Sequence, residues 1–193
     1  QRSLALTTTG AHNTAVGGNS LYANTTGASN VAVGSLALTS NTTGSYHVAI
    51  GREALEANTT GNGSVAIGYQ ALHTATESNH QVAIGFEVMK STTTGTANTM
   101  IGYRAGHNHT TGTNNTALGY SALYSITEAS YNTAIGQNAC SSITDGGQNN
   151  TAVGAGALTW VNNGDNNVAV GRNALLADTT GSNNTAVGVD TLL

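Results

Sequence analysis

The chain has 193 residues, a formal net charge of −4, only 7% charged residues and no Pro. With five Lys and Arg in total, it lacks the basic surface that neutralises nucleic-acid phosphates, so nucleic acid is not an expected partner. Its apolar runs are far shorter than the roughly 20 residues that cross a bilayer, and the start Gln1-Arg2-Ser3 has no signal-peptide form, so membrane insertion is not expected.

A 17-residue repeat runs through the whole sequence and predicts one domain over residues 1–193, which begins and ends in mid-repeat. A pentapeptide resembling Asn-Thr-Ala-Val-Gly ends on a repeat glycine at Gly17, Gly34, Gly51, Gly68, Gly85, Gly102, Gly119, Gly136, Gly154, Gly171 and Gly188. Every interval is 17 residues except one of 18, whose extra residue falls within 144–147, a segment with turn composition.

Each pentapeptide predicts a short strand, once per repeat. The residue three before the repeat glycine is Val or Thr, and the residue directly before it is Val, Ile or Leu. Between them stands Ala, except for Met100, so one strand face is β-branched and the other is nearly bare. We expect the β-branched residues to form a narrow core and the Ala and Gly face to pack against neighbouring chains, in a trimer. The alternative is that this face lines the flattened interior of a single chain.

The remainder of each repeat predicts a second short strand and two turns. An apolar residue, usually Leu preceded by Ala, stands four residues after the repeat glycine. Cys140 takes this place in one repeat, which favours a buried small hydrophobe over a nucleophile. Turns of the form Asn-Thr-Thr-Gly at 24–27, 41–44 and 58–61 follow, and a further turn, usually with Asn, precedes each pentapeptide.

These elements predict an all-β fold, a parallel β-solenoid or β-roll of eleven 17-residue coils. Stacked coils place identical residues above one another, so the Asn residues are expected to form amide ladders.

The pentapeptides at 30–34, 64–68 and 81–85, each followed by Ala three residues later, resemble the head repeats of trimeric autotransporter adhesins. The alternation of Asn-Thr-Ala-Val-Gly with Asn-Thr-Thr-Gly is similar to repeats of bacteriophage tail fibres. The resemblance covers the whole chain and implies a left-handed parallel β-roll in a tight trimer, used for attachment. The repeat is longer than is typical of the adhesin heads, which predicts a longer outer turn.

Aromatic residues supply the candidate binding surface. Directly after the repeat glycine, four consecutive repeats carry Tyr69, Phe86, Tyr103 and Tyr120. Such a ladder stabilises the stack by packing, and where exposed it is a flat patch suited to sugar rings or to another protein. Trp160 stands where other repeats have small or polar residues, and is a second candidate contact.

No catalytic constellation is evident, so we expect neither an enzyme nor a cofactor. His107 and His109 form the one metal candidate, because His-x-His near a threefold axis could supply imidazoles to an ion; the alternative is two exposed turn residues. Thr pairs such as Thr25-Thr26 make an ice-binding solenoid a minor alternative, although Glu77 and Glu128 interrupt the series.

The sequence therefore predicts a structural or adhesive fibre element, located extracellularly, at a cell surface or on a virion. Its expected partners are further copies of itself and a cell-surface glycan or protein receptor. The alternative function is a self-assembling extracellular filament whose subunits stack head to tail through uncapped ends.

Overall fold

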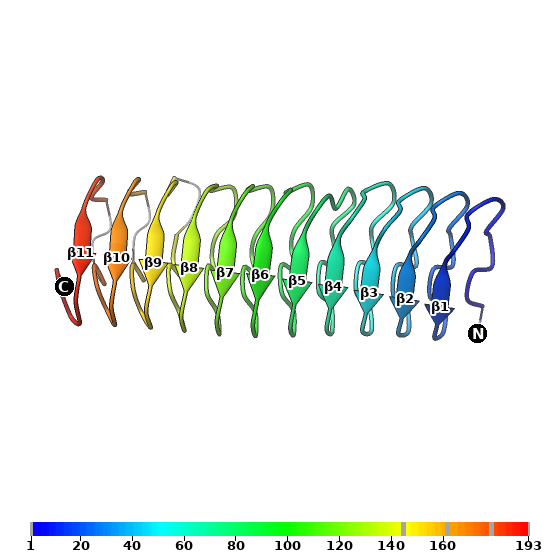
Figure 1. Ribbon diagram of the computed structural model, residues 1–193, viewed down its shortest axis with the longest axis horizontal. Coiled ribbons are helices and arrows are strands. Elements are labelled where there is room, and N and C mark those ends of the chain that lie inside the picture. The colour runs from blue at the N-terminus through cyan, green and yellow to red at the C-terminus, as the bar shows by residue number, and fades with distance from the viewer. Residues whose placement is uncertain (1, 144–145, 161–162, 178–179, 193) are drawn as a thin grey trace.

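The computed structural model describes residues 2–143, 146–160, 163–177 and 180–192. It is an all-β rod of stacked coils, and the chain ends lie at opposite ends of the rod (Figure 1). Each coil contributes one three-residue strand, and neighbouring strands pair in parallel in sequence order. The strands are β1 Thr14–Val16, β2 Val31–Val33, β3 Val48–Ile50, β4 Val65–Ile67, β5 Val82–Ile84, β6 Thr99–Ile101, β7 Thr116–Leu118, β8 Thr133–Ile135, β9 Thr151–Val153, β10 Val168–Val170 and β11 Thr185–Val187. The predicted parallel β-solenoid is confirmed.

Register between coils follows the repeat, including at the 18-residue interval. Val48 pairs with Val65, 17 residues on, and Thr133 pairs with Thr151, 18 residues on. The extra residue is therefore absorbed outside the strands. The sequence places it within 144–147, of which 144 and 145 lie outside the described residues.

The second strand predicted in each coil is wrong. The segment after the repeat glycine consists of turns, and both Ala37 and Leu38 are fully buried, whereas adjacent residues of a strand point to opposite faces. Leu36 and Leu38 have φ values of 61° and 55°. The segment still bonds along the stack, because Leu38 N donates to Ala54 O at 2.9 Å and Leu36 N donates to Gly18 O at 2.9 Å.

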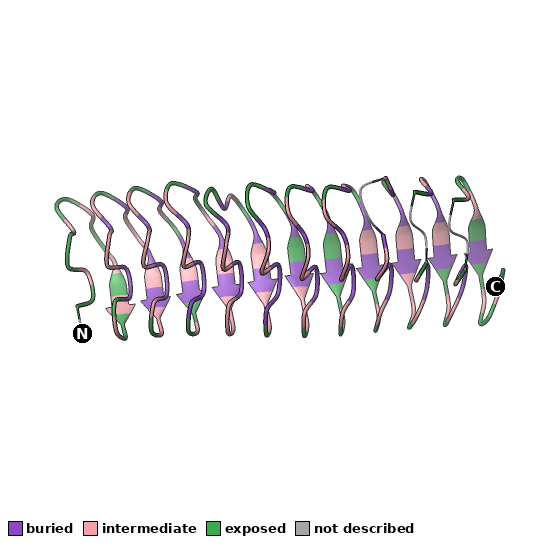
Figure 2. Ribbon diagram, turned by 180° about the vertical axis from the view of Figure 1, so that it is seen from behind, coloured by how far each residue is buried: buried purple, intermediate pink, exposed green. Residues whose placement is uncertain are grey.

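The Ala residues of the strands face the interior of the coil, so the expectation that they meet neighbouring chains is wrong and the alternative is correct. Ala32 and Ala49 are fully buried, and the central residue of β2 to β11 is buried (Figure 2). The Leu residues of the facing segment fill the space opposite, which leaves room only for small side chains on the strand. The β-branched residues point outward instead, as the 57% exposure of Val16 and the 69% exposure of Val187 show.

Glycine is required at the end of each pentapeptide because of its backbone conformation and because the next coil lies so close. Gly51 has φ 132°, and a Cβ built on it would overlap the carbonyl group of Gly68 in the next coil. The same close approach recurs from coil to coil, so the spacing of the stack depends on this position having no side chain.

Buried amides form the predicted ladders. Asn41 Nδ2 donates to Asn24 Oδ1 and to Gly44 O, each at 2.9 Å, and Asn58 Nδ2 donates to Asn41 Oδ1 at 3.0 Å. In a second ladder, Asn30 Oδ1 accepts from the backbone N of His47 at 2.9 Å. These bonds satisfy polar groups inside the rod that would otherwise oppose folding.

Candidate functional site

The four aromatic residues predicted to form a ladder do so. Ring centroids are separated by 5.2 Å for Tyr69 and Phe86, 5.3 Å for Phe86 and Tyr103, and 5.0 Å for Tyr103 and Tyr120. Arg52 lies over the Tyr69 ring at 5.9 Å and covers one end of the ladder. At the other end Tyr120 is 53% exposed. The ladder is therefore both a packing element and an accessible surface.

A second, shorter aromatic stack lies beside the first and was not predicted. The rings of His107 and Tyr124 are 5.3 Å apart and 10° from parallel. Both residues stand five places after their repeat glycine, where the sequences of neighbouring repeats differ widely. A signal was available in the abrupt change from Tyr124 to Ser141, its counterpart in the next coil.

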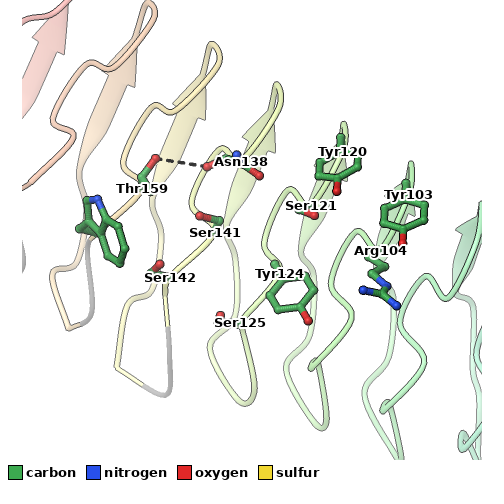
Figure 3. Close-up of a pocket in the computed structure, with 11 residues that line it drawn as sticks. Tyr103, Arg104, Tyr120, Ser121, Tyr124, Ser125, Asn138, Ser141, Ser142 and Thr159 are labelled. Carbon is green, nitrogen blue, oxygen red and sulfur yellow. Dashed lines mark hydrogen bonds between the residues drawn. The ribbon is translucent and has the colours of Figure 1, made fainter.

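An open groove of about 450 Å³ adjoins the ends of these two stacks (Figure 3). Tyr103, Tyr120 and Tyr124 line it on one side, and Trp160, two coils further along the rod, lines it on the other. The hollow exists because the coil in between presents only small side chains there, such as Ser141. The structure thus brings together three of the five predicted aromatic contacts. Tyr69 and Phe86 belong to the ladder but do not line the groove.

The groove combines aromatic walls with a neutral polar floor. Ser and Asn side chains from two consecutive coils face it, including Ser121, Asn138 and Ser142. Among the described lining residues Arg104 alone is charged. Its Nε lies 2.8 Å from a carboxylate oxygen of Glu87, and its guanidinium lies over the Tyr103 ring at 5.2 Å. The hydrogen bond that Arg104 donates to Glu87 raises the pKa of Arg104. This pairing balances its charge locally.

A group of charged residues around Glu87 lies beside the ladder. Burial would raise the pKa of Glu87, but hydrogen bonds from Lys90 and Arg104 outweigh this and hold its pKa below the ordinary value. His107 Nε2 also lies 3.4 Å from Glu87. This carboxylate therefore joins groups from two consecutive coils.

A further cluster contains potential metal ligands. Ligand atoms of Glu53, Glu56 and His73 all lie within 4.8 Å of one another. Glu53, however, already accepts hydrogen bonds from Gln70 at 2.5 Å and from Arg52 at 2.9 Å, and the bond from Gln70 lowers the pKa of Glu53. An occupied carboxylate beside an arginine is an ion-pair network rather than a preformed cation site.

The predicted His-x-His pair is not brought together. His109 is fully buried, with Nδ1 2.8 Å from Thr92 Oγ1 and Nε2 2.9 Å from Gly112 O, and burial lowers its pKa to about 4. His107 instead lies at the groove side of the rod against Tyr124. The two imidazoles therefore do not form a joint metal site in this chain.

Two other predicted features take structural roles. Cys140 is fully buried, and burial raises the pKa of its thiol, as expected for a core residue. Thr25, the first residue of the first Thr pair, uses its hydroxyl within the stack, since Oγ1 donates to Thr42 O at 3.0 Å. Thr42 and Thr59 repeat this contact in the next coils.

No protein-family model matches this chain, and no curated protein or solved structure shows significant similarity to it. Within the described residues, no helix has the length and apolar character needed to span a membrane. The functional argument therefore depends on the geometry of the rod and the groove.

Proposed function

We propose that this protein is a structural and adhesive fibre element of a cell surface or virion, in which a rod carries a surface for attachment. The observation that carries the proposal is the uninterrupted parallel stacking of β1 to β11. At about 4.8 Å per coil, such a stack extends for about 50 Å. A long, regular body of this kind is suited to spacing and display, and the groove between Tyr124 and Trp160 offers an attachment surface on its side.

The outward face of the sheet supports self-association. Ile50, Leu118 and Val170 are 37%, 48% and 37% exposed, and equivalent residues continue along the whole sheet. Along the sheet these residues are exposed or half-buried, and an apolar strip that solvent reaches in this way is typical of protein interfaces. In the proposed trimer, three rods meet through this β-branched face, while the Ala residues stay inside each chain.

The solution mass of the purified chain, measured by light scattering together with electron microscopy, tests the proposal. We expect a discrete mass of three chains and short rods. Filaments that lengthen with concentration would instead support the head-to-tail filament subunit. A stable monomer at all concentrations would contradict self-association through the outward face.

A further inference from the structure

The two aromatic stacks end in the same coil and leave two ring faces uncovered. Tyr103 covers one face of Tyr120, with the rings 11° from parallel, and His107 covers one face of Tyr124. In the next coil the equivalent places are taken by Gln137 and Ser141, which have no ring. The free faces of Tyr120 and Tyr124 therefore front onto the same hollow.

The depth of that hollow along the rod matches one six-membered ring. Trp160 belongs to the second coil beyond that of Tyr124, a separation of about 10 Å at about 4.8 Å per coil. Rings within the existing ladder are spaced 5.0 to 5.3 Å apart. A single ring placed in the empty coil position thus reaches van der Waals contact with Tyr124 on one side and approaches Trp160 on the other.

The polar floor of the groove favours a ligand whose ring carries hydroxyl groups around its edge. Among the described residues, no hydrogen bond links the hydroxyls of Ser121, Ser125, Ser141 and Ser142 to another group of the chain. Many polar side chains elsewhere are bonded along the stack, as Thr42 is to Thr59 O. A pyranose has apolar C–H faces and a rim of hydroxyls, so it stacks on the rings while its rim meets the serines. A purely aromatic ligand would match the walls but leave the serine hydroxyls without partners.

Charge favours a neutral ligand. In the part of the lining that the structure describes, Arg104 is the one cationic residue, and its Nε lies 2.8 Å from a carboxylate oxygen of Glu87. Because Glu87 already balances the charge of Arg104, a carboxylated or sulfated sugar gains less from this guanidinium than it would from an unpaired one.

We infer that the groove between Tyr124 and Trp160 binds a neutral saccharide, with pyranose rings stacked on the free faces of Tyr120 and Tyr124. This inference rests on the proposed adhesive function and names the chemical class of its receptor.

Trp160 makes the test direct, because it is the one tryptophan of the chain, so its fluorescence reports on the groove. Lactose, cellobiose and diacetylchitobiose serve as neutral probes, and sialyllactose is the anionic match to lactose. We expect at least one neutral disaccharide to change the Trp160 fluorescence saturably and to show saturation transfer by NMR. Failure of all three, or tighter binding of sialyllactose than of lactose, would overturn the inference.

Variants locate the site. Tyr124→Ala and Trp160→Ala should each weaken NMR-detected binding at least tenfold, while Tyr124→Phe retains it. Tyr22→Ala is the matched control, because Tyr22 occupies the equivalent place in the first coil, away from the groove lining. Equal binding by Tyr124→Ala and the unmodified chain would refute the site.

Attachment of the full chain to glycan-bearing cells, measured in parallel, separates the inference from the proposed function. Attachment that persists in Tyr124→Ala and Trp160→Ala would refute the saccharide groove and leave the adhesive function intact. A chain that stays monomeric and attaches to no cells would refute the adhesive function itself.

Discussion

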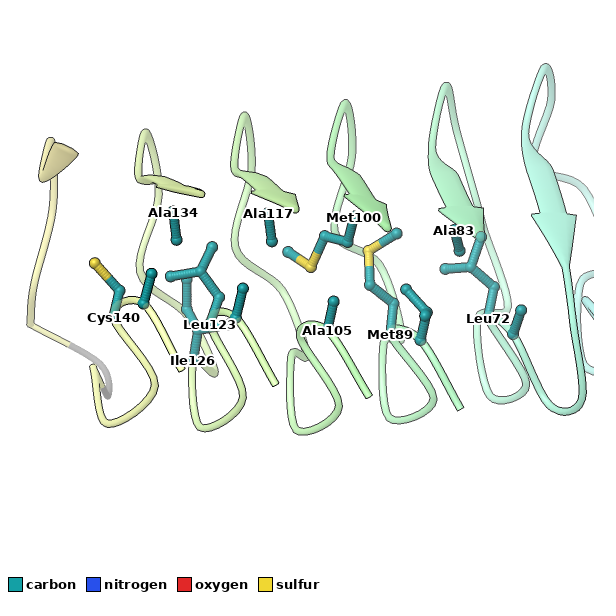
Figure 4. Close-up of a cluster of buried hydrophobic side chains, with 14 of the residues drawn as sticks. Leu72, Ala83, Met89, Met100, Ala105, Ala117, Leu123, Ile126, Ala134 and Cys140 are labelled. Carbon is teal, nitrogen blue, oxygen red and sulfur yellow. The ribbon is translucent and has the colours of Figure 1, made fainter. Parts of the chain in front are cut away.

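Met100 fills the space that a side chain at position 106 would occupy. A Cβ built on Gly106 would overlap Met100 Sδ, and Met89 Cγ lies 3.5 Å from the same point. Most coils pair Ala on the strand with Leu on the facing segment. This coil has the reverse arrangement, with the large Met100 on the strand and Gly106 on the facing segment. Figure 4 shows Met100 reaching from its strand toward the facing segment at Ala105.

Truncation of this side chain should therefore be costly. Met100→Ala leaves both sides of the coil without a large residue, and we expect a loss of about 2 to 5 kcal/mol in the free energy of unfolding. The double variant Met100→Ala/Gly106→Leu restores the arrangement of the other coils and should recover most of the loss. Gly106 has φ 57°, close to the 52° of Leu123 in the next coil, so leucine fits the backbone. Urea unfolding measures the stability of both variants. A double variant no more stable than Met100→Ala would contradict the idea that Met100 replaces the missing leucine at position 106.

The outward face offers a second test. Lys at positions 50 and 118 places charge on the apolar strip without entering the core, since Ile50 and Leu118 are 37% and 48% exposed. We expect Ile50→Lys/Leu118→Lys to reduce the solution mass to that of one chain while leaving the circular dichroism of the fold unchanged. Thr43→Lys is the control, because Thr43 is exposed in a turn away from the strands. An unchanged trimer mass in the double variant would show that this face is not the interface.

The amide ladder predicts a difference between buried and exposed asparagines. Asn41→Ala removes the donor to the buried Asn24 Oδ1 and the acceptor of Asn58 Nδ2, whereas Gly44 O keeps its bond from Asn30 Nδ2. A loss of about 1 to 3 kcal/mol is therefore expected. Asn62 also bonds to the next coil, with Oδ1 accepting from Ser45 N at 2.9 Å, but it is exposed and water can replace it. Asn62→Ala should therefore cost clearly less in urea unfolding. Equal losses for the two variants would contradict a role for burial.

The repeat period predicted the solenoid, its register and its ladders because stacking places equal residues above one another. Which strand face turns inward was mispredicted for a physical reason. The alternation of side chains along a strand shows that the two β-branched positions share a face, but it does not show which of the two faces is enclosed. Adjacent buried residues such as Ala37 and Leu38 decide this, since their segment fills the interior and leaves room only for Ala32 on the strand. The same pair also argues against a second strand.

The groove was only partly predictable. Tyr120 and Trp160 stand out in single columns of the repeat, but the hollow depends on the relation between columns. Tyr124 acquires its role because Tyr120 ends a stack in the same coil and because Ser141 follows in the next one. Such a site can be predicted only when it is known which positions of the repeat are neighbours in the folded coil.

Stability should decrease in acid because of a buried histidine. Burial lowers the pKa of His109 from 6.5 to about 4, so between these values the unfolded chain binds a proton that the folded chain does not. Stability therefore rises with pH across this window and is lost as pH falls from 6.5 toward 4, by on the order of 3 kcal/mol for this residue. Burial also lowers the pKa of His47, which acts in the same direction.

The variant that isolates this effect replaces the imidazole with a residue that the rod already accommodates. Asn24, Asn41 and Asn58 hold the equivalent place in the first three coils, so His109→Asn should fold and should flatten the pH dependence. Urea midpoints at pH 7 and pH 5 measure the difference, with the exposed His80→Asn as the control that should retain the full dependence. If His109→Asn loses as much stability between pH 7 and pH 5 as the unmodified chain, then protonation of His109 does not account for the acid sensitivity, and His47 becomes the residue to replace.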